Sequence, residues 1–299
     1  MKERFMSSIR TANTSVCHVL ALFRWQFWGI SLIPVLIGYS MNPQLLEWHR
    51  LAVLLVIFGP CLEGAAEAIT DYFDVETDRP ETVKKIAGIQ LSGGTGLVQT
   101  GTFARPTVLA LSLSAYVIGV ILAACFFPAL FVMTVGAGVF LGIAYSAPPF
   151  RFKARGLLGP LSVGISFGCI TLLAGFTSGG TIPQTGTILR MLPLVLIVTG
   201  LFLTHQIVDY DADLRASVRT FCVCHGLMTT RVVSGLLIIG GVFTVFTLPR
   251  HSLVTAWPAI LVFIGLLSVL AALVRGRITP LVRVTAVLLE ATVGILWLV

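Results

Sequence analysis

Ten of the thirteen acidic residues in this 299-residue chain fall into two short windows. The first window holds Glu63, Glu67, Asp71, Asp74, Glu76, Asp78 and Glu81, and the second holds Asp209, Asp211 and Asp213. Carboxylate oxygens are hard ligands that suit Mg²⁺, an ion that often bridges to substrate phosphates. Two acidic windows that face each other could therefore hold one metal–diphosphate unit between them. The alternative is that both windows are solvated charges beside cationic neighbours.

The spacing within each window places carboxylates on common helix faces. At about 100° per residue, a helix would gather five acids of the first window within an arc of roughly 80°. Those five are Glu63, Glu67, Asp71, Asp74 and Asp78. In the second window, Asp209 and Asp213 are four residues apart and share a face, whereas Asp211 lies half a helical turn away. Like charges on one face repel each other, so the pattern favours a bound cation.

The elements that carry these acids must lie in a membrane. Hydrophobic residues make up 56% of the chain and charged residues only 11%, too few to cover the surface of a soluble protein of this size. Soluble enzyme folds are therefore excluded. The net charge of +7 is explained by membrane topology rather than by a nucleic-acid partner, and none is expected. We expect an all-α, polytopic membrane protein.

About twenty apolar residues are needed to cross the hydrocarbon core, and only helices satisfy their own backbone there. Nine such spans are predicted, at 23–41, 51–70, 106–125, 127–146, 157–176, 187–207, 230–248, 253–273 and 279–298. They are expected to form one domain over residues 1–299. Two longer segments between spans, 71–105 and 208–229, are expected to cap the bundle.

Lysine and arginine are distributed unevenly between the two ends of the predicted spans. Sixteen lie on the side of the N-terminus, and only Arg50, Arg190 and Arg250 lie on the other. Because cytoplasmic segments carry the positive excess, the N-terminus is expected in the cytoplasm and the C-terminus outside, in the cell membrane. Both acidic windows then lie at the cytoplasmic side.

Five segments resemble, in order, motifs of the UbiA superfamily of intramembrane prenyltransferases. TDYFDVETD at 70–78 resembles the N-D-x-x-D-x-x-x-D motif, with Thr70 in place of Asn, and DYDAD at 209–213 matches D-x-x-x-D. YSAPPFRFK at 145–153 resembles the family's Y-S-x-P-P-x-R-x-K loop. The stretch 24–38 and Arg219-Thr220 followed by Gly226 resemble two further motifs.

This resemblance implies a Mg²⁺-dependent transfer of a polyprenyl group from an isoprenoid diphosphate to an aromatic quinone precursor, within the lipid bilayer. The aspartates implied as catalytic metal ligands are Asp71, Asp74, Asp78, Asp209 and Asp213. The residues implied to bind substrate are Arg24, Arg79, Tyr145, Arg151 and Lys153. Nearby aromatic rings would shelter an allylic cation. Asp211, Glu67 or the diphosphate itself could remove the final proton.

The acceptor is the least determined part of this interpretation. Asp71-Tyr72-Phe73-Asp74 resembles the D-Y-F-D of the 1,4-dihydroxy-2-naphthoate prenyltransferase branch, which makes menaquinone. Hydroxybenzoate, homogentisate, chlorophyllide, haem and glycerol-phosphate acceptors belong to other branches and stay open. Two other hypotheses are a transporter that uses Glu63, Glu67 and Glu290 as a proton path, and a catalytically silent homologue. His205 is expected to be structural.

Overall fold

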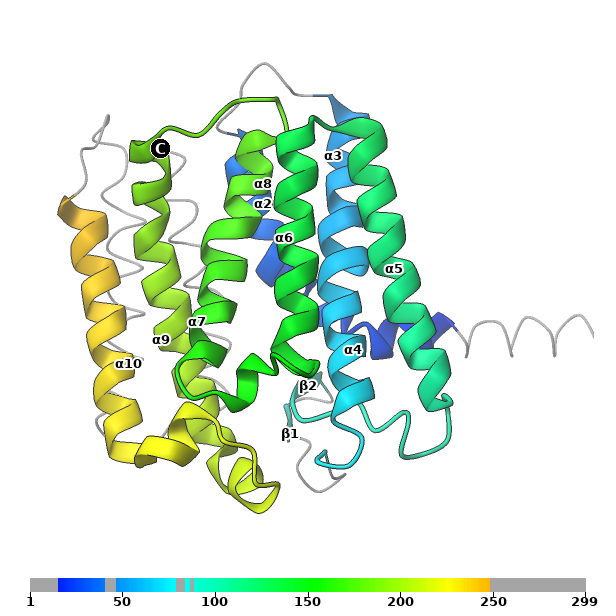
Figure 1. Ribbon diagram of the computed structural model, residues 1–299, viewed down its shortest axis with the longest axis vertical. Helices are drawn as coiled ribbons and strands as arrows, with labels where there is room; N and C mark the ends of the chain where they lie inside the picture. Colours follow the sequence, from blue (N-terminus) through cyan, green and yellow to red (C-terminus); the bar gives the residue numbers. More distant parts are fainter. Residues whose placement is uncertain (1–15, 41–46, 79–83, 87–88, 248–299) are drawn as a thin grey trace, which may run out of the picture.

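The computed structural model describes residues 16–40, 47–78, 84–86 and 89–247, which form a bundle of helices (Figure 1). The helices are α2 (Trp28–Ser40), α3 (Trp48–Val56), α4 (Ala65–Phe73), α5 (Arg105–Phe126), α6 (Ala129–Ser146), α7 (Leu158–Ile165), α8 (Thr171–Thr177), α9 (Thr185–Arg215) and α10 (Phe221–Thr247). Two π-helical stretches, Ile57–Gly64 and Ser166–Ile170, join α3 to α4 and α7 to α8. Before α2 lie a helix over Val16–Leu22 and a 3₁₀ turn, Trp25–Phe27.

Six helical segments are long and apolar enough to cross a membrane, and a seventh is a pair, Val16–Leu22 and Trp25–Ser40, bent by 49°. These segments correspond to the first seven predicted spans. The last two predicted spans, 253–273 and 279–298, lie outside the described residues. The expectation of an all-α polytopic bundle is confirmed, and the total of nine spans stays a prediction.

The two segments between spans that are expected to cap the bundle contain regular secondary structure. Residues 208–229 are mostly helical, because α9 continues to Arg215 and α10 already begins at Phe221, with a kink at Gly226, where φ is +82°. Residues 71–105 begin as the last turn of α4 and contain an antiparallel hairpin of β1 (Lys84–Ile86) and β2 (Ile89–Ser92). The apolar runs of the sequence predicted the spans, but not the helical turns that continue from them into the charged segments.

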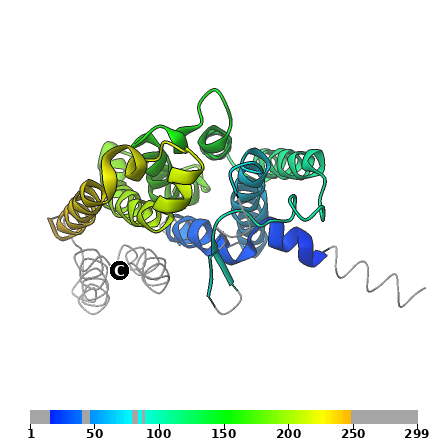
Figure 2. The ribbon, with the colours of Figure 1, turned by 90° about the horizontal axis from the view of Figure 1, so that it is seen from below.

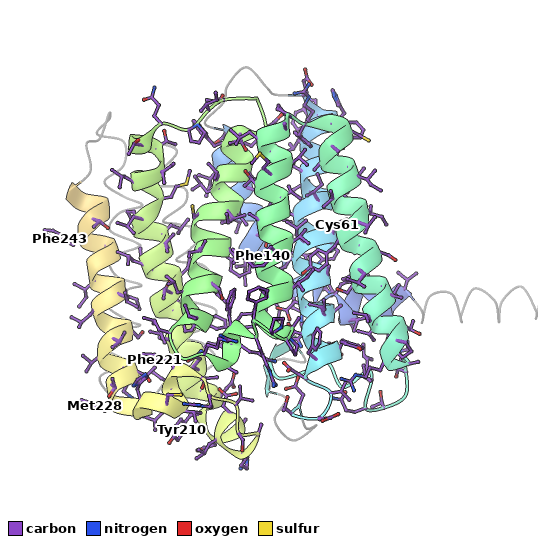
Figure 3. All side chains as sticks on the ribbon, viewed as in Figure 1. Cys61, Phe140, Tyr210, Phe221, Met228 and Phe243 are labelled. Atoms are coloured by element: carbon purple, nitrogen blue, oxygen red, sulfur yellow. The ribbon has the colours of Figure 1, made fainter. Side chains whose placement is uncertain are left out.

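Close backbone contacts hold the helices together in the bundle interior. A Cβ added at Gly38 of α2 would overlap the carbonyl oxygen of Leu172, and one at Gly175 of α8 would overlap the carbonyl oxygen of Val35. Such small-residue contacts are the usual means of packing helices in lipid, where no hydrophobic force drives association. On the outer surface of the bundle, large apolar side chains such as Met228 and Phe243 point outward from α10 (Figure 3). They are 70% and 66% exposed.

Both acidic windows lie at the same end of the bundle, at the bottom of Figure 1. The C-terminal ends of α4, α6 and α9, the start of α10 and the β1–β2 hairpin meet there. Seen from this end, the hairpin lies between the α4–α5 side and the α9–α10 side (Figure 2). Gly156 and Thr220 form a parallel bridge, and the Gly156 N–H donates to the Arg219 carbonyl at 3.2 Å. This bridge ties the link after α6 to the link between α9 and α10.

Candidate active site

The first acidic window is only partly helical. Helix α4 ends at Phe73, and the carbonyl of Asp74 then accepts the N–H groups of Thr77 and Asp78 at 3.0 and 2.8 Å. The prediction that Asp78 continues the helical stripe is therefore wrong, because the chain turns after Asp74. Glu63 lies in the π-helical stretch Ile57–Gly64, so its angular position relative to the other acids of the window also differs from that of a regular α-helix.

The turn nevertheless keeps Asp78 close to the other carboxylates. Burial raises the pKa of Asp78 to about 7, and the charges of Asp74 and Asp71 act in the same direction. Arg24 and Lys153 oppose this shift without cancelling it. The carboxylates of Asp71, Asp74 and Asp78 therefore lie near one another, with Arg24 and Lys153 as their cationic neighbours.

Arg24 lies at the bend before α2 and reaches two acids of the first window. Its backbone is left-handed, with φ of +45°, and its side chain is buried. Nη1 lies 2.9 Å from Glu67 Oε2, and Nη2 lies 2.6 Å from Asp71 Oδ1. The resemblance implied that Arg24 binds substrate, which stays a prediction; in the structure its side chain pairs with these two carboxylates.

Lys153 joins the loop after α6 to the end of α4. It sits in a short 3₁₀ turn, Phe152–Ala154, which follows Arg151 at φ +41°. The ammonium group of Lys153 forms an ion pair with Asp74 Oδ1, and both side chains are only 9% exposed. A topology charge would lie in solvent, so the burial of Lys153 favours a role in the site.

The second acidic window occupies the last turns of α9. Asp209 Oδ2 lies 3.2 Å from His205 Nε2, one turn earlier. The His205 ring stacks on Phe202 with centroids 5.4 Å apart, and Phe202 meets Tyr145 of α6 edge-on at 6.2 Å. His205 thus contacts an acid of the candidate site. The four-residue spacing between His205 and Asp209, which places both on one helix face, is the sequence feature that could have predicted this contact.

The two windows converge on Lys153 and Tyr145. Asp213 hydrogen-bonds the side chain of Thr220 and lies within electrostatic reach of Asp209, Lys153 and Asp74. Tyr145 lies within electrostatic reach of acids from both windows, namely Glu67, Asp74, Asp209 and Asp213. Segments more than 130 residues apart in sequence therefore share one charged region, as the motif spacing suggested.

The loop before α5 covers the first window, and its contacts were not foreseen. Thr95 donates from its backbone N–H to Asp71 Oδ2 at 3.1 Å, and its hydroxyl also bonds that oxygen. Gln99 Nε2 donates to the carbonyls of Val75 and Asp78 at 3.3 and 3.1 Å. A Cβ on Gly94 would collide with the Asp78 carboxylate. The glycines of this loop thus allow its backbone to approach the acids closely.

The remaining predicted residues divide by exposure. Asp211 is exposed, as its position half a turn from Asp209 predicted, whereas Asp209 and Asp213 are half-buried. Thr70, which replaces the motif's Asn, shares a 3.0 Å hydrogen bond with Ser146 of α6. Arg151 is half-buried beside Lys153. Arg79 lies outside the described residues.

The donor chemistry suits Mg²⁺, although in the described part of the chain no three acidic, histidine or cysteine side chains are already grouped as metal ligands. The carboxylates of Asp71 and Asp74 are instead held by Arg24 and Lys153. Metal binding would require these pairs to loosen. The oxygen donors of these carboxylates fit a hard divalent cation.

Comparison with known proteins identifies relatives in sequence and in fold. A sequence model described as the UbiA prenyltransferase family matches residues 31–288. Chlorophyll synthase of chloroplasts from Oryza sativa subsp. japonica is 26% identical over 183 residues, or 60% of this chain and 46% of that protein. The enzyme of the same name from Arabidopsis thaliana is 24% identical over 68% of this chain and 51% of that protein. The chain therefore spans about half the length of these curated relatives.

Solved structures share the fold over nearly the whole chain. A UbiA homologue from Archaeoglobus fulgidus bound to GPP and Mg²⁺ has a TM-score of 0.65 and 16% identity, covering 94% of this chain and 97% of its own. The same homologue bound to Cd²⁺ has a TM-score of 0.69 and 17% identity, covering 94% and 99% of the two chains. At these identities the likeness concerns the fold.

Proposed function

The chain belongs to the UbiA prenyltransferase family, and from this premise we propose that it transfers a polyprenyl group from an isoprenoid diphosphate to an aromatic acceptor, releasing diphosphate. The observation that carries the proposal is that both acidic windows lie at one end of a membrane-embedded bundle. Lys153 pairs there with Asp74 of the first window, and the Gly156–Thr220 bridge joins the loop that carries Lys153 to the segment after the second window. An isoprenoid diphosphate has an anionic head and a lipid-soluble tail, so a charged site at a membrane surface suits both ends.

In this proposal the five motif aspartates would hold Mg²⁺, which would supply positive charge to neutralise the departing diphosphate. The five are Asp71, Asp74, Asp78, Asp209 and Asp213. Lys153 and Arg151 bind the diphosphate oxygens, and Arg24 sets the charge and orientation of Asp71. A positive group beside the departing diphosphate stabilises the charge that develops as the C1–O bond breaks.

Aromatic rings border the same region and suit the cationic allyl group. Tyr145 lies edge-on to Phe202, and Phe150 of the loop after α6 packs against Phe140 at 5.4 Å and Phe152 at 5.7 Å. The π-faces of such rings attract cations. Of the candidate bases, Glu67 is occupied by Arg24 and Asp211 is exposed, so the diphosphate is the favoured proton acceptor.

Two acceptors have specific support. The Asp71-Tyr72-Phe73-Asp74 sequence supports a naphthoate acceptor and a role in menaquinone synthesis. The likeness to chlorophyll synthases supports a tetrapyrrole carboxylate as the second candidate. The proton-path alternative is disfavoured, because Glu67 is paired with Arg24 and Glu63 accepts a hydrogen bond from Ser31 at 2.7 Å.

Membranes that contain the chain should transfer label from a prenyl diphosphate to one member of an acceptor panel. The panel includes dihydroxynaphthoate, hydroxybenzoate, homogentisate and chlorophyllide. EDTA should abolish transfer and added Mg²⁺ should restore it, because the carboxylates hold the diphosphate through the metal. Transfer that persists in EDTA would contradict the metal-dependent mechanism, and no transfer to any acceptor would contradict the proposed reaction.

We expect the charged end of the bundle to face the cytoplasm of the cell membrane. A reporter inserted at Thr102, beside the first acidic window, should read as cytoplasmic. A reporter at Ile182, in the exposed link between α8 and α9 at the opposite end, should read as extracytoplasmic. The physical reason is the excess of Lys and Arg at the end of the bundle that carries the acidic windows. Reporters that read on the same side would overturn this topology.

A further inference from the structure

Asp71 of the first acidic window is a heavily hydrogen-bonded carboxylate. It is only 4% exposed, and it receives donors from two directions. Arg24 Nη2 donates a hydrogen bond to Asp71 Oδ1 at 2.6 Å. Thr95 donates to Asp71 Oδ2 from both its backbone N–H and its hydroxyl. A carboxylate offers about four lone-pair sites, so these donors leave Asp71 little freedom to rotate.

The proton of the Thr95 hydroxyl has a defined direction. The N–H of Leu97 donates to Thr95 Oγ1 at 3.3 Å, so this oxygen already acts as an acceptor on one side. Its own hydrogen is then free to be donated to Asp71 Oδ2. The bond is charge-assisted, which makes it stronger than a bond between neutral partners.

The segment that carries Thr95 is built to approach the acids closely. Gly93 and Gly96, on either side, have φ of +78° and +75°, a conformation that favours glycine. Gly94 lies against the Asp78 side chain, with a built Cβ only 3.0 Å from Asp78 Cβ. Further along, Gln99 binds two carbonyls of the turn that carries Asp78. The segment 93–99 therefore contacts the first window at both ends.

We propose that Thr95 is a positioning residue that fixes the orientation of Asp71 for metal binding, through its hydroxyl. The inference rests on the proposed function, because it assigns Thr95 to the metal site of that reaction. Groups that hydrogen-bond a ligating carboxylate fix its direction, and their loss typically weakens metal binding by about 10–100-fold. The alternative is that Thr95 only closes the loop onto the bundle.

The test uses the full chain in nanodiscs and three variants. Thr95→Val keeps the size, the β-branch and the backbone N–H but removes the hydroxyl. Thr95→Ser keeps the hydroxyl and is the rescue variant. Thr102→Val is the matched control in the same loop, because the hydroxyl of Thr102 bonds only the exposed Thr100 hydroxyl, at 3.0 Å, among the contacts of the described residues.

Mn²⁺ affinity measured by electron paramagnetic resonance without prenyl diphosphate gives a readout that does not depend on turnover. Thr95→Val should raise the Mn²⁺ dissociation constant, and the Mg²⁺ concentration for half-maximal transfer, by about 10-fold or more. Transfer at saturating Mg²⁺ should change far less. Thr95→Ser and Thr102→Val should keep wild-type metal affinity.

Two outcomes would overturn the inference. One is a Thr95→Val chain with wild-type Mn²⁺ affinity, and in that case a lower melting temperature would assign Thr95 to loop closure alone. The other is a Thr95→Ser chain that binds Mn²⁺ as weakly as Thr95→Val, because the hydroxyl would then not be the active group. A wild-type chain that transfers no prenyl group would instead contradict the proposed function. The comparison of Mn²⁺ dissociation constants would still test the role of Thr95.

Discussion

Replacing Asp74 or Asp209 with asparagine is expected to reduce prenyl transfer by about 100-fold or more. Asparagine keeps the shape of the side chain but removes one negative charge and one hard oxygen ligand, so the metal and the diphosphate would be lost together. Asp74 belongs to the first window, where it pairs with Lys153, and Asp209 belongs to the second, where it lies 3.2 Å from His205 Nε2. The rate of label transfer at saturating acceptor measures the effect. The same loss is expected at Asp71 and Asp213.

Asp211→Asn is the matched control for Asp209→Asn. Asp211 lies two residues away on the same helix and is exposed, so its substitution should leave most of the activity. Melting temperatures of all variants separate lost chemistry from lost folding. Near-wild-type rates in both Asp74→Asn and Asp209→Asn would show that the acidic windows are a solvated cap, and that the chain shares the family's fold without its chemistry.

Replacing Lys153 with alanine is expected to lower both stability and transfer. Its ammonium group pairs with Asp74 in a buried position, and removal of one partner leaves the other charge unpaired at a cost of about 3–5 kcal/mol. Loss of the cation also removes a group that stabilises the departing diphosphate, which should reduce turnover about 100-fold. Prenyl diphosphate KM, turnover and melting temperature should be measured together.

A neutral pair separates the two roles of Lys153. In the double variant Asp74→Asn, Lys153→Met no charge is left unpaired, so the melting temperature should return toward wild type while transfer stays lost. Arg155→Ala is the control for a topology charge, because Arg155 is exposed and its Nη2 donates to the Pro149 carbonyl at 2.6 Å. Lys153→Ala with an unchanged KM, turnover and melting temperature would contradict both roles.

The membrane bundle and the general location of the site could be predicted from sequence, because both depend on local patterns. A run of about twenty apolar residues can only be a helix in lipid, and this holds whatever it packs against. The structure accordingly places its seven candidate membrane-spanning segments at the first seven predicted spans. The placement of the acids at span ends, and the exposure of Asp211 opposite Asp209, followed from the same helical period.

Prediction failed where the helical period itself ends. Asp78 was assigned to the stripe of α4, but the chain turns after Asp74, and no local signal in the run from Asp71 to Asp78 separates a helix end from a continuing helix. In the second window the error was the reverse, because α9 continues eight residues beyond the predicted span end at 207. A hydropathy pattern predicts a loop wherever charged residues follow an apolar run, even where these residues continue the helix beyond the membrane.

The partners of the charged groups were decided only by the tertiary structure. Arg24 reaches Asp71 across 47 positions, Lys153 reaches Asp74 across 79, and Thr95 reaches Asp71 across 24. The resemblance implied that Arg24 and Lys153 bind substrate, which stays a prediction; the structure pairs them with Asp71 and Asp74. Residue type and spacing by themselves determined which groups carry charge and that both acidic windows lie at the same end of the bundle. Which opposite charges meet depends on how separate helices pack, and packing places residues side by side that have no relation along the chain.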